Sequence, residues 1–126
     1  MMKSIPVWKQ ELSGGVHAAR LASLYCCAPA ETASEAARYA AVLDGLEKTF
    51  GPHAEAGLYS APGRTEIGGN HTDHNNGVVL AGSVNLDMVA VVSPNEDNII
   101  RVKSLGYDTV SYAHLRAHET LMNLVC

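Results

Sequence analysis

Residues 63–77 read Gly-Arg-Thr-Glu-Ile-Gly-Gly-Asn-His-Thr-Asp-His-Asn-Asn-Gly, and this stretch decides how the rest of the chain is interpreted. It places a guanidinium, carboxylates, imidazoles and amides among four glycines. Such groups need hydrogen-bonding partners when buried, so the stretch cannot lie in an apolar core. Mostly apolar residues precede it at 58–61 and follow it at 78–81. We therefore expect a polar loop between two strands, an arrangement that presents a site for a small polar ligand.

The region before the loop predicts one clear helix. Thr32 and Glu35 fit a capping box, because Glu35 follows the Thr32 hydroxyl by three residues. Gly51 and Pro52 form a helix stop signal. Residues 4–25 predict an irregular or short-helical segment, broken at residues 14–15. Between the cap and the stop, apolar side chains recur at helical spacing: Ala36, Tyr39 or Ala40, Leu43, Leu46 and Phe50.

Strand signals make up most of the remaining chain. They lie at 57–61, 78–84, 86–93 and 98–104. The turn-forming cluster at 94–98 predicts a hairpin between the last two. Residues 111–126 are loosely spaced for a helix. The sequence thus predicts an α+β fold with a small, mostly antiparallel sheet and helices packed on one face. We expect one sheet edge to lack a partner and to allow self-association.

The amino-acid composition indicates the kind of protein, excludes some classes of partner and suggests a cellular compartment. The chain has 126 residues, of which 47% are hydrophobic and 17% charged, as in one globular domain. A net charge of −4 without a Lys/Arg cluster argues against a nucleic-acid partner. No stretch reaches the roughly 20 apolar residues that span a bilayer, so we expect no membrane partner. An odd number of cysteines, at positions 26, 27 and 126, indicates free thiols and a cytoplasmic protein.

The side chains of the loop suit a polyhydroxylated ligand. Asp73 can accept hydrogen bonds from two adjacent hydroxyls, while Asn70 and His71 can both donate and accept. Arg64 is a permanent cation that can orient a carboxylate or stabilise charge developing on an oxygen. The simpler alternative is that these groups satisfy one another and cap backbone ends in a tight loop.

A metal site is a second alternative. His71, Asp73 and His74 are three ligand types within four residues, and they form half of the metallo-β-lactamase-type pattern His-x-His-x-Asp-His. The first histidine of that pattern would fall on Gly69, which argues against a metal. Nucleotide loops are missing as well, because none of the four lysines follows a glycine and no Rossmann fingerprint is present.

The same stretch resembles the N-terminal signature of galactokinases, in the superfamily that includes homoserine and mevalonate kinases. The usual form is Gly-Arg-Val-Asn-Leu-Ile-Gly-Glu-His-Thr-Asp-Tyr-Asn, followed by a glycine step and a Val-Leu strand. Looser similarity runs from Gly57 to Tyr107. The matching positions are 61–64, Gly69, His71, Thr72, Asp73, Asn75 and 77–80.

The resemblance implies a galactose-binding element in the N-terminal part of a two-domain sugar kinase fold. By analogy, His71 and Asp73 hydrogen-bond the sugar hydroxyls, and Arg64 lies near the anomeric hydroxyl that accepts the phosphoryl group. Asn70 stands where the family usually has a sugar-binding Glu, and His74 replaces a Tyr. These departures leave the sugar open, so that a related hexose or an amino sugar is also conceivable.

The resemblance also implies ATP and Mg²⁺ as cofactors of the complete family enzyme, which converts galactose to galactose 1-phosphate. The family's phosphate loop and catalytic aspartate lie downstream of the matched region, and this chain contains neither. We therefore expect residues 1–110 to be the sugar-binding region of a fragment that binds no cofactor and is inactive alone. Residues 111–126 are a tail of uncertain assignment. The alternatives are a non-catalytic sugar-sensing module and a metal-binding, hydrolase-like fragment.

Overall fold

A computed structural model describes residues 1–69, 75–96, 99–112 and 122–125 of the chain. Helices α1 (Ile5–Ser13) and α2 (Ala18–Tyr25), the 3-10 turn η1 (Pro29–Glu31) and helix α3 (Thr32–Phe50) come first. They are followed by five strands, namely β1 (Gly57–Gly68), β2 (Leu80–Pro94), β3 (Ile100–Lys103), β4 (Val110–Tyr112) and β5 (Met122–Val125).

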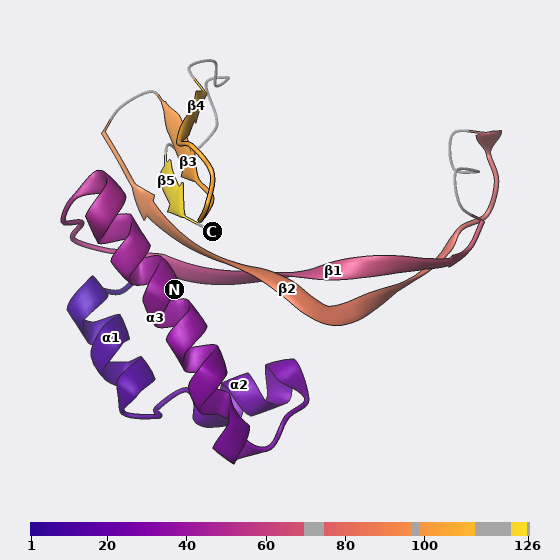
Figure 1. The fold of residues 1–126 in the computed structure, drawn as a ribbon, viewed down its shortest axis with the longest axis horizontal. Helices are drawn as coiled ribbons and strands as arrows, with labels where there is room; N and C mark the ends of the chain where they lie inside the picture. The colour runs from indigo at the N-terminus through magenta and orange to yellow at the C-terminus, as the bar shows by residue number, and fades with distance from the viewer. Residues whose placement is uncertain (70–74, 97–98, 113–121, 126) are drawn as a thin grey trace.

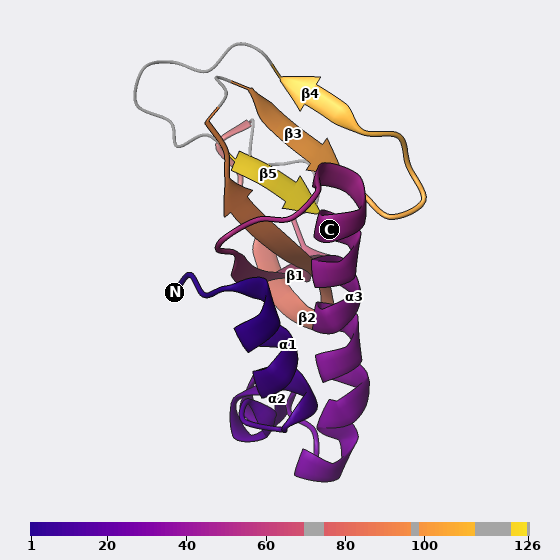
Figure 2. The same ribbon diagram turned by 90° about the vertical axis from the view of Figure 1, so that its left-hand side faces the viewer.

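The strands form one sheet in the order β1-β2-β5-β3-β4 (Figure 2). Three of its pairings are antiparallel, and β3 with β5 is parallel. The α+β class predicted from the sequence is confirmed.

Helix α3 forms the spine of the core. Its buried side chains Tyr39, Val42, Leu43 and Leu46 follow the i, i+3, i+4, i+7 spacing of one helix face. They join a single cluster with Ile5 of α1 and Val91 of β2, both fully buried. The predicted stop is confirmed, because Gly51 follows the helix with φ 83°, a conformation that favours glycine.

The start of α3 differs from the predicted capping box. The N-cap residue is Glu31, and the Thr32 hydroxyl donates a 2.7 Å hydrogen bond to the Pro29 carbonyl oxygen. The reason is that η1 runs directly into α3, so the hydroxyl faces the preceding turn and cannot cap the helix. The predicted break of the first segment is confirmed, since α1 ends at Ser13 and Gly15 has φ 71°.

Strands β1 and β2 form a long antiparallel hairpin that reaches away from the helices (Figure 1). The pairing extends from Gly57 opposite Val92 to Gly68 opposite Leu80. Two separate strands were predicted at 78–84 and 86–93, but the structure has the single strand β2. β2 pairs with β1 on both sides of a register shift between Pro62 and Arg64, so the predicted break is an irregularity within one strand. We call the part of this hairpin beyond Ala61 and Met88 the arm.

The middle of the sheet contradicts two predictions. β2 and β3 do not form a hairpin, because β5 lies between them. Residues 122–125 are not helical, since β5 pairs with β2 through Val91 opposite Val125 and runs parallel to β3. Pairing with partners distant in sequence overrides the weak local spacing of the tail. Residues 113–121 and 126 of the predicted helix lie outside the described residues.

Two further expectations concern the surface and the thiols. Of the helices that the structure describes, none is long and apolar enough to cross a lipid bilayer. Cys26 and Cys27 are free, as predicted, and Cys126 lies outside the described residues.

Candidate functional site

Residues 64–68 of the polar stretch run along β1 to the far end of the arm, beside the start of β2 (Figure 1). Gly68 is the last residue of β1 and pairs with Leu80, the first of β2. The adjoining Gly69 has φ 81°, and a Cβ there would lie 2.1 Å from the Val78 carbonyl oxygen. A side chain at this position is therefore excluded both by the backbone conformation and by the close approach of the two strands. The glycine of the sequence pattern is a geometric requirement for closing the loop.

Of the four predicted sugar-binding residues, Arg64 is within the described part of the chain. It lies on β1 opposite Ser83, just after a register shift that follows Pro62. Irregularities of this kind re-aim the side chains that follow them. The partner side chain is small, and the Arg64 side chain is 78% exposed. Its Nη2 lies 3.8 Å from Glu66 Oε1, a loose ion pair that leaves most of the guanidinium open to a ligand.

The other predicted site residues, Asn70, His71 and Asp73, lie outside the described residues, as does His74. The structure places Arg64 on β1, the strand that precedes them in sequence. The convergence of the four side chains on one ligand stays a prediction.

The root of the hairpin is fixed by a carboxylate that the sequence analysis missed. Asp87 of β2 has a side chain only 4% exposed, and it accepts hydrogen bonds from three other elements. Tyr25 of α2 donates to Oδ2 at 2.6 Å and Ser60 of β1 donates to the same oxygen at 2.5 Å. Arg38 of α3 donates to Oδ1 at 2.7 Å and also pairs with Glu35. One carboxylate thus ties the hairpin that leads to the polar loop to two helices.

The ionisation of this cluster follows from these contacts. Burial acts to raise the pKa of Asp87, but the hydrogen bonds from Ser60, Tyr25 and Arg38 outweigh it and hold the pKa below its ordinary value. Burial and the hydrogen bond to Asp87 raise the pKa of Tyr25. The hydrogen bonds to Asp87 and Glu35 raise the pKa of Arg38. Asp87 is therefore ionised and Arg38 charged at neutral pH.

A sequence signal for this cluster does exist. Asp87 is a lone carboxylate within the apolar run of β2, and a charge in such a run needs partners when the strand is buried. Its partners come from positions 25, 38 and 60, which no local pattern connects.

The metal alternative receives no support from the described part of the chain. Within residues 1–69, 75–96 and 99–112, no group of three or more His, Cys, Asp or Glu side chains could hold an ion. The residues of the alternative itself, His71, Asp73 and His74, lie outside those ranges.

Comparison with known proteins bears on the same segment. Residues 46–94, which include the end of α3, β1, the polar stretch and β2, match the galactokinase galactose-binding signature. The resemblance predicted from the sequence is confirmed over this segment.

Individual galactokinases show the same partial similarity. The chain is 39% identical over 69 residues to a galactokinase of Lacticaseibacillus casei, which is 55% of this chain and 18% of that protein. It is 40% identical over 63 residues to a galactokinase of Streptomyces coelicolor, which is 50% of this chain and 16% of that protein. The chain therefore spans less than a fifth of the length of these relatives. No solved structure matches the chain.

Proposed function

We propose that the outer end of the arm is a monosaccharide-binding element of the galactokinase type, with galactose or a closely related hexose as its ligand. The observation that carries this proposal is the match of residues 46–94 to the galactose-binding signature. The exposed Arg64 and the close backbone approach at Gly69 support it, because both lie on the segment that precedes the polar residues 70–73 in sequence.

We assign the roles by the chemistry of each group. Asp73 and His71 hydrogen-bond adjacent sugar hydroxyls, and Asn70 contributes a neutral acceptor and donor. Arg64 orients the anomeric oxygen and offsets negative charge developing there. The network at Asp87 holds the root of the hairpin and so limits where the sugar element can move.

Phosphoryl transfer is a property of whole galactokinases, which in general use ATP and Mg²⁺. Such transfer needs groups that position and neutralise the γ-phosphate. For this chain on its own we propose sugar binding without transfer, as part of a cytoplasmic galactokinase-type protein. The free thiols of Cys26 and Cys27 support that compartment.

Isothermal titration with galactose, glucose and N-acetylgalactosamine tests the proposal. We expect heat with galactose, and a loss of affinity of about 100-fold in Asp73→Ala. That change removes two charge-assisted hydrogen bonds worth roughly 3 kcal/mol together. The matched control is Asp108→Asn, an exposed carboxylate outside the arm, which should bind as the wild type does.

Two results would overturn the proposal: no heat from any of the three sugars, or equal affinity in Asp73→Ala and the wild type. Incubation with galactose and ATP-Mg²⁺ is a separate test. Formation of galactose 1-phosphate by this chain alone would refute the absence of transfer and leave the sugar site standing.

A further inference from the structure

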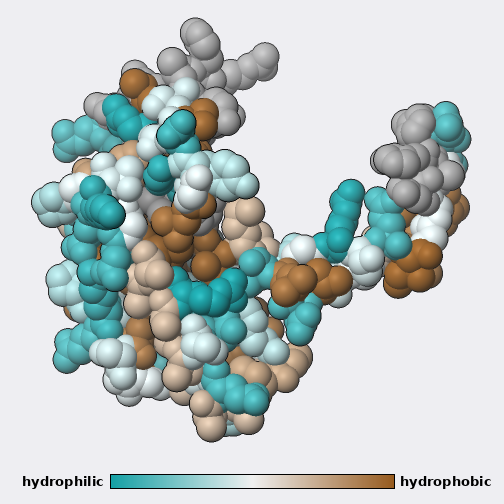
Figure 3. Space-filling model, viewed as in Figure 1, coloured by the Kyte–Doolittle hydropathy of each residue, from teal (hydrophilic) through white to brown (hydrophobic). Residues whose placement is uncertain are grey.

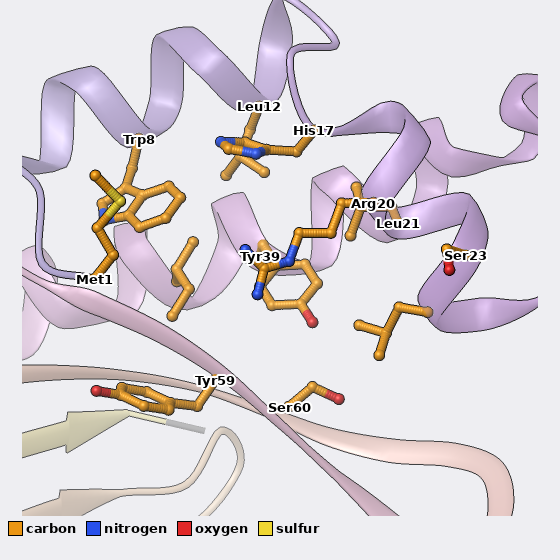
Figure 4. A pocket seen from close by; sticks show the side chains of 12 residues that line it. Met1, Trp8, Leu12, His17, Arg20, Leu21, Ser23, Tyr39, Tyr59 and Ser60 are labelled. Atoms are coloured by element: carbon orange, nitrogen blue, oxygen red, sulfur yellow. The ribbon is translucent and has the colours of Figure 1, made fainter.

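A cavity of about 570 Å³ lies among α1, α2, α3 and the first residues of β1 (Figure 4). This volume is in the range that holds a small organic molecule. Its walls are largely apolar and aromatic, so a ligand would need a flat or apolar body. The wall residues with the largest side chains are Trp8, Leu12, Leu24, Tyr39, Leu58 and Tyr59.

The charged side chain that lines the cavity is positive. Arg20 is the lining side chain with a permanent charge, and no aspartate or glutamate lines the cavity. Arg20 is exposed on α2, and Figure 4 shows it extending from the helix toward the cavity. Within the described part of the chain, no hydrogen bond or ion pair engages it. Arg38, in contrast, forms ion pairs with Glu35 and Asp87.

The carboxylate of Glu11, next to the cavity-lining His17, is already paired with other side chains. Glu11 Oε2 lies 2.5 Å from Lys3 Nζ and 2.7 Å from His17 Nε2. The hydrogen bonds from Lys3 and His17 hold the pKa of Glu11 below its usual value. The His17 ring lies against Trp8, with ring centroids 5.5 Å apart. Glu11 therefore does not compensate Arg20, and the cavity keeps an unpaired cation beside an aromatic wall.

We infer that this cavity is a binding site for a small aromatic anion, with a carboxylate or sulfonate on Arg20 and a planar body between Trp8 and Tyr59. A guanidinium binds such groups through paired N–H donors. Aromatic walls stack on a planar body and exclude water from it. The site shares no residue with the polar loop and does not depend on sugar binding.

Two naphthalene probes of nearly the same shape test the charge requirement. 8-Anilinonaphthalene-1-sulfonate carries the anion, and N-phenyl-1-naphthylamine lacks it. Trp8 is the single tryptophan of the chain and lines the cavity, so binding in the cavity should quench its emission, and the dependence of this quenching on Arg20 locates the probe. We expect the sulfonate to quench Trp8 with about tenfold higher affinity than the neutral probe, since it adds one charge-assisted contact.

The substitution Arg20→Gln should weaken sulfonate binding about tenfold, to the level of the neutral probe, whose own affinity should stay unchanged. Lys48→Gln is the matched control, because it removes one positive charge from an exposed position that does not line the cavity. As a measurement on the wild type, raising salt from about 50 mM to about 500 mM should weaken the sulfonate alone.

Equal affinity for both probes, or full sulfonate affinity in Arg20→Gln, would overturn the inference. So would probe fluorescence without quenching of Trp8, since the probe would then sit elsewhere, for example on the apolar arm. If Arg20→Gln did not fold, the salt response of the wild type would decide between the outcomes.

Discussion

The substitution Asp87→Asn removes the charge from the carboxylate that joins β1, β2, α2 and α3 while keeping its shape. Three donors, from Tyr25, Ser60 and Arg38, lose a charged acceptor. The new amide offers one oxygen and adds an NH₂ group that faces donors. Tyr25 can still turn to the Tyr39 hydroxyl, 3.0 Å away, and Arg38 keeps Glu35. The remaining contacts therefore compensate part of the stability that is lost with the hydrogen bonds to Asp87.

The magnitude follows from these contacts. Each hydrogen bond to a charged group contributes about 1.5–3 kcal/mol. The Arg38 side chain is 40% exposed, so solvent screens its share. We expect the free energy of unfolding to fall by about 3 kcal/mol in total. With an m-value of about 2 kcal/mol/M, the urea midpoint falls by about 1.5 M. The emission of Trp8, whose indole N–H donates to the Ala56 carbonyl oxygen at 2.7 Å, follows the transition.

The same reasoning predicts a pH signature. The folded pKa of Asp87 lies below its ordinary value of 3.8. Its ionised form thus stabilises the fold fully above that value, and this contribution is lost as the pH falls through the folded pKa. The stability gap between wild type and Asp87→Asn should be widest near neutrality and should shrink as the pH falls below 3.8 and through the lower folded pKa. Asp108→Asn, an exposed control, should change stability by less than about 0.5 kcal/mol. An Asp87→Asn variant as stable as this control, or a gap independent of pH, would refute the reasoning.

Three further predictions concern the arm and the core. Gly69→Ala places a side chain 2.1 Å from the Val78 carbonyl oxygen at a backbone φ of 81°. The resulting strain of about 1–3 kcal/mol should weaken galactose binding about tenfold, as measured by titration calorimetry. Unchanged affinity would contradict the geometry on which this prediction rests. Leu43→Ala should lower the free energy of unfolding by about 3 kcal/mol, because Leu43 is fully buried. Lys9→Ala should lower it by less than about 1 kcal/mol, because the ion pairs of Lys9 with Asp44 and Glu47 are exposed. Urea denaturation of both variants checks this order, and similar losses would contradict it. The wild type should self-associate through the arm, because its strands carry exposed apolar residues such as Leu86, which is 76% exposed. Figure 3 shows hydrophobic patches along the arm. Leu86→Lys should reduce the particle size in light scattering, and a monomeric wild type would argue against association through the arm.

Local patterns predicted the parts of the fold that local forces decide. Helix α3 follows from the apolar spacing between Thr32 and Phe50 and from the stop at Gly51. Its first turn was predicted wrongly because the preceding η1 turn, which the sequence analysis did not anticipate, takes the Thr32 hydroxyl. Local spacing also mistook β5 for a helix, because a four-residue strand has almost no periodicity of its own.

The functional features also differ in whether their residues are adjacent in the sequence. The polar stretch at 63–77 was recognisable because its residue types and glycines are adjacent in sequence, and the galactokinase signature is read from that order. The anchor at Asp87 and the cavity beside Arg20 were not recognisable, because each gathers side chains from three or four elements.

The sequence by itself determined the α+β class, the principal helix and the resemblance to galactokinases, since all of these depend on neighbours along the chain. Only the tertiary structure decided that β5 enters the middle of the sheet, that one buried carboxylate fixes the root of the hairpin, and that an aromatic cavity leaves Arg20 unpaired. These features arise from contacts between residues far apart in the chain. Such contacts form only when burial of the shared core brings the elements together, so no local pattern encodes them.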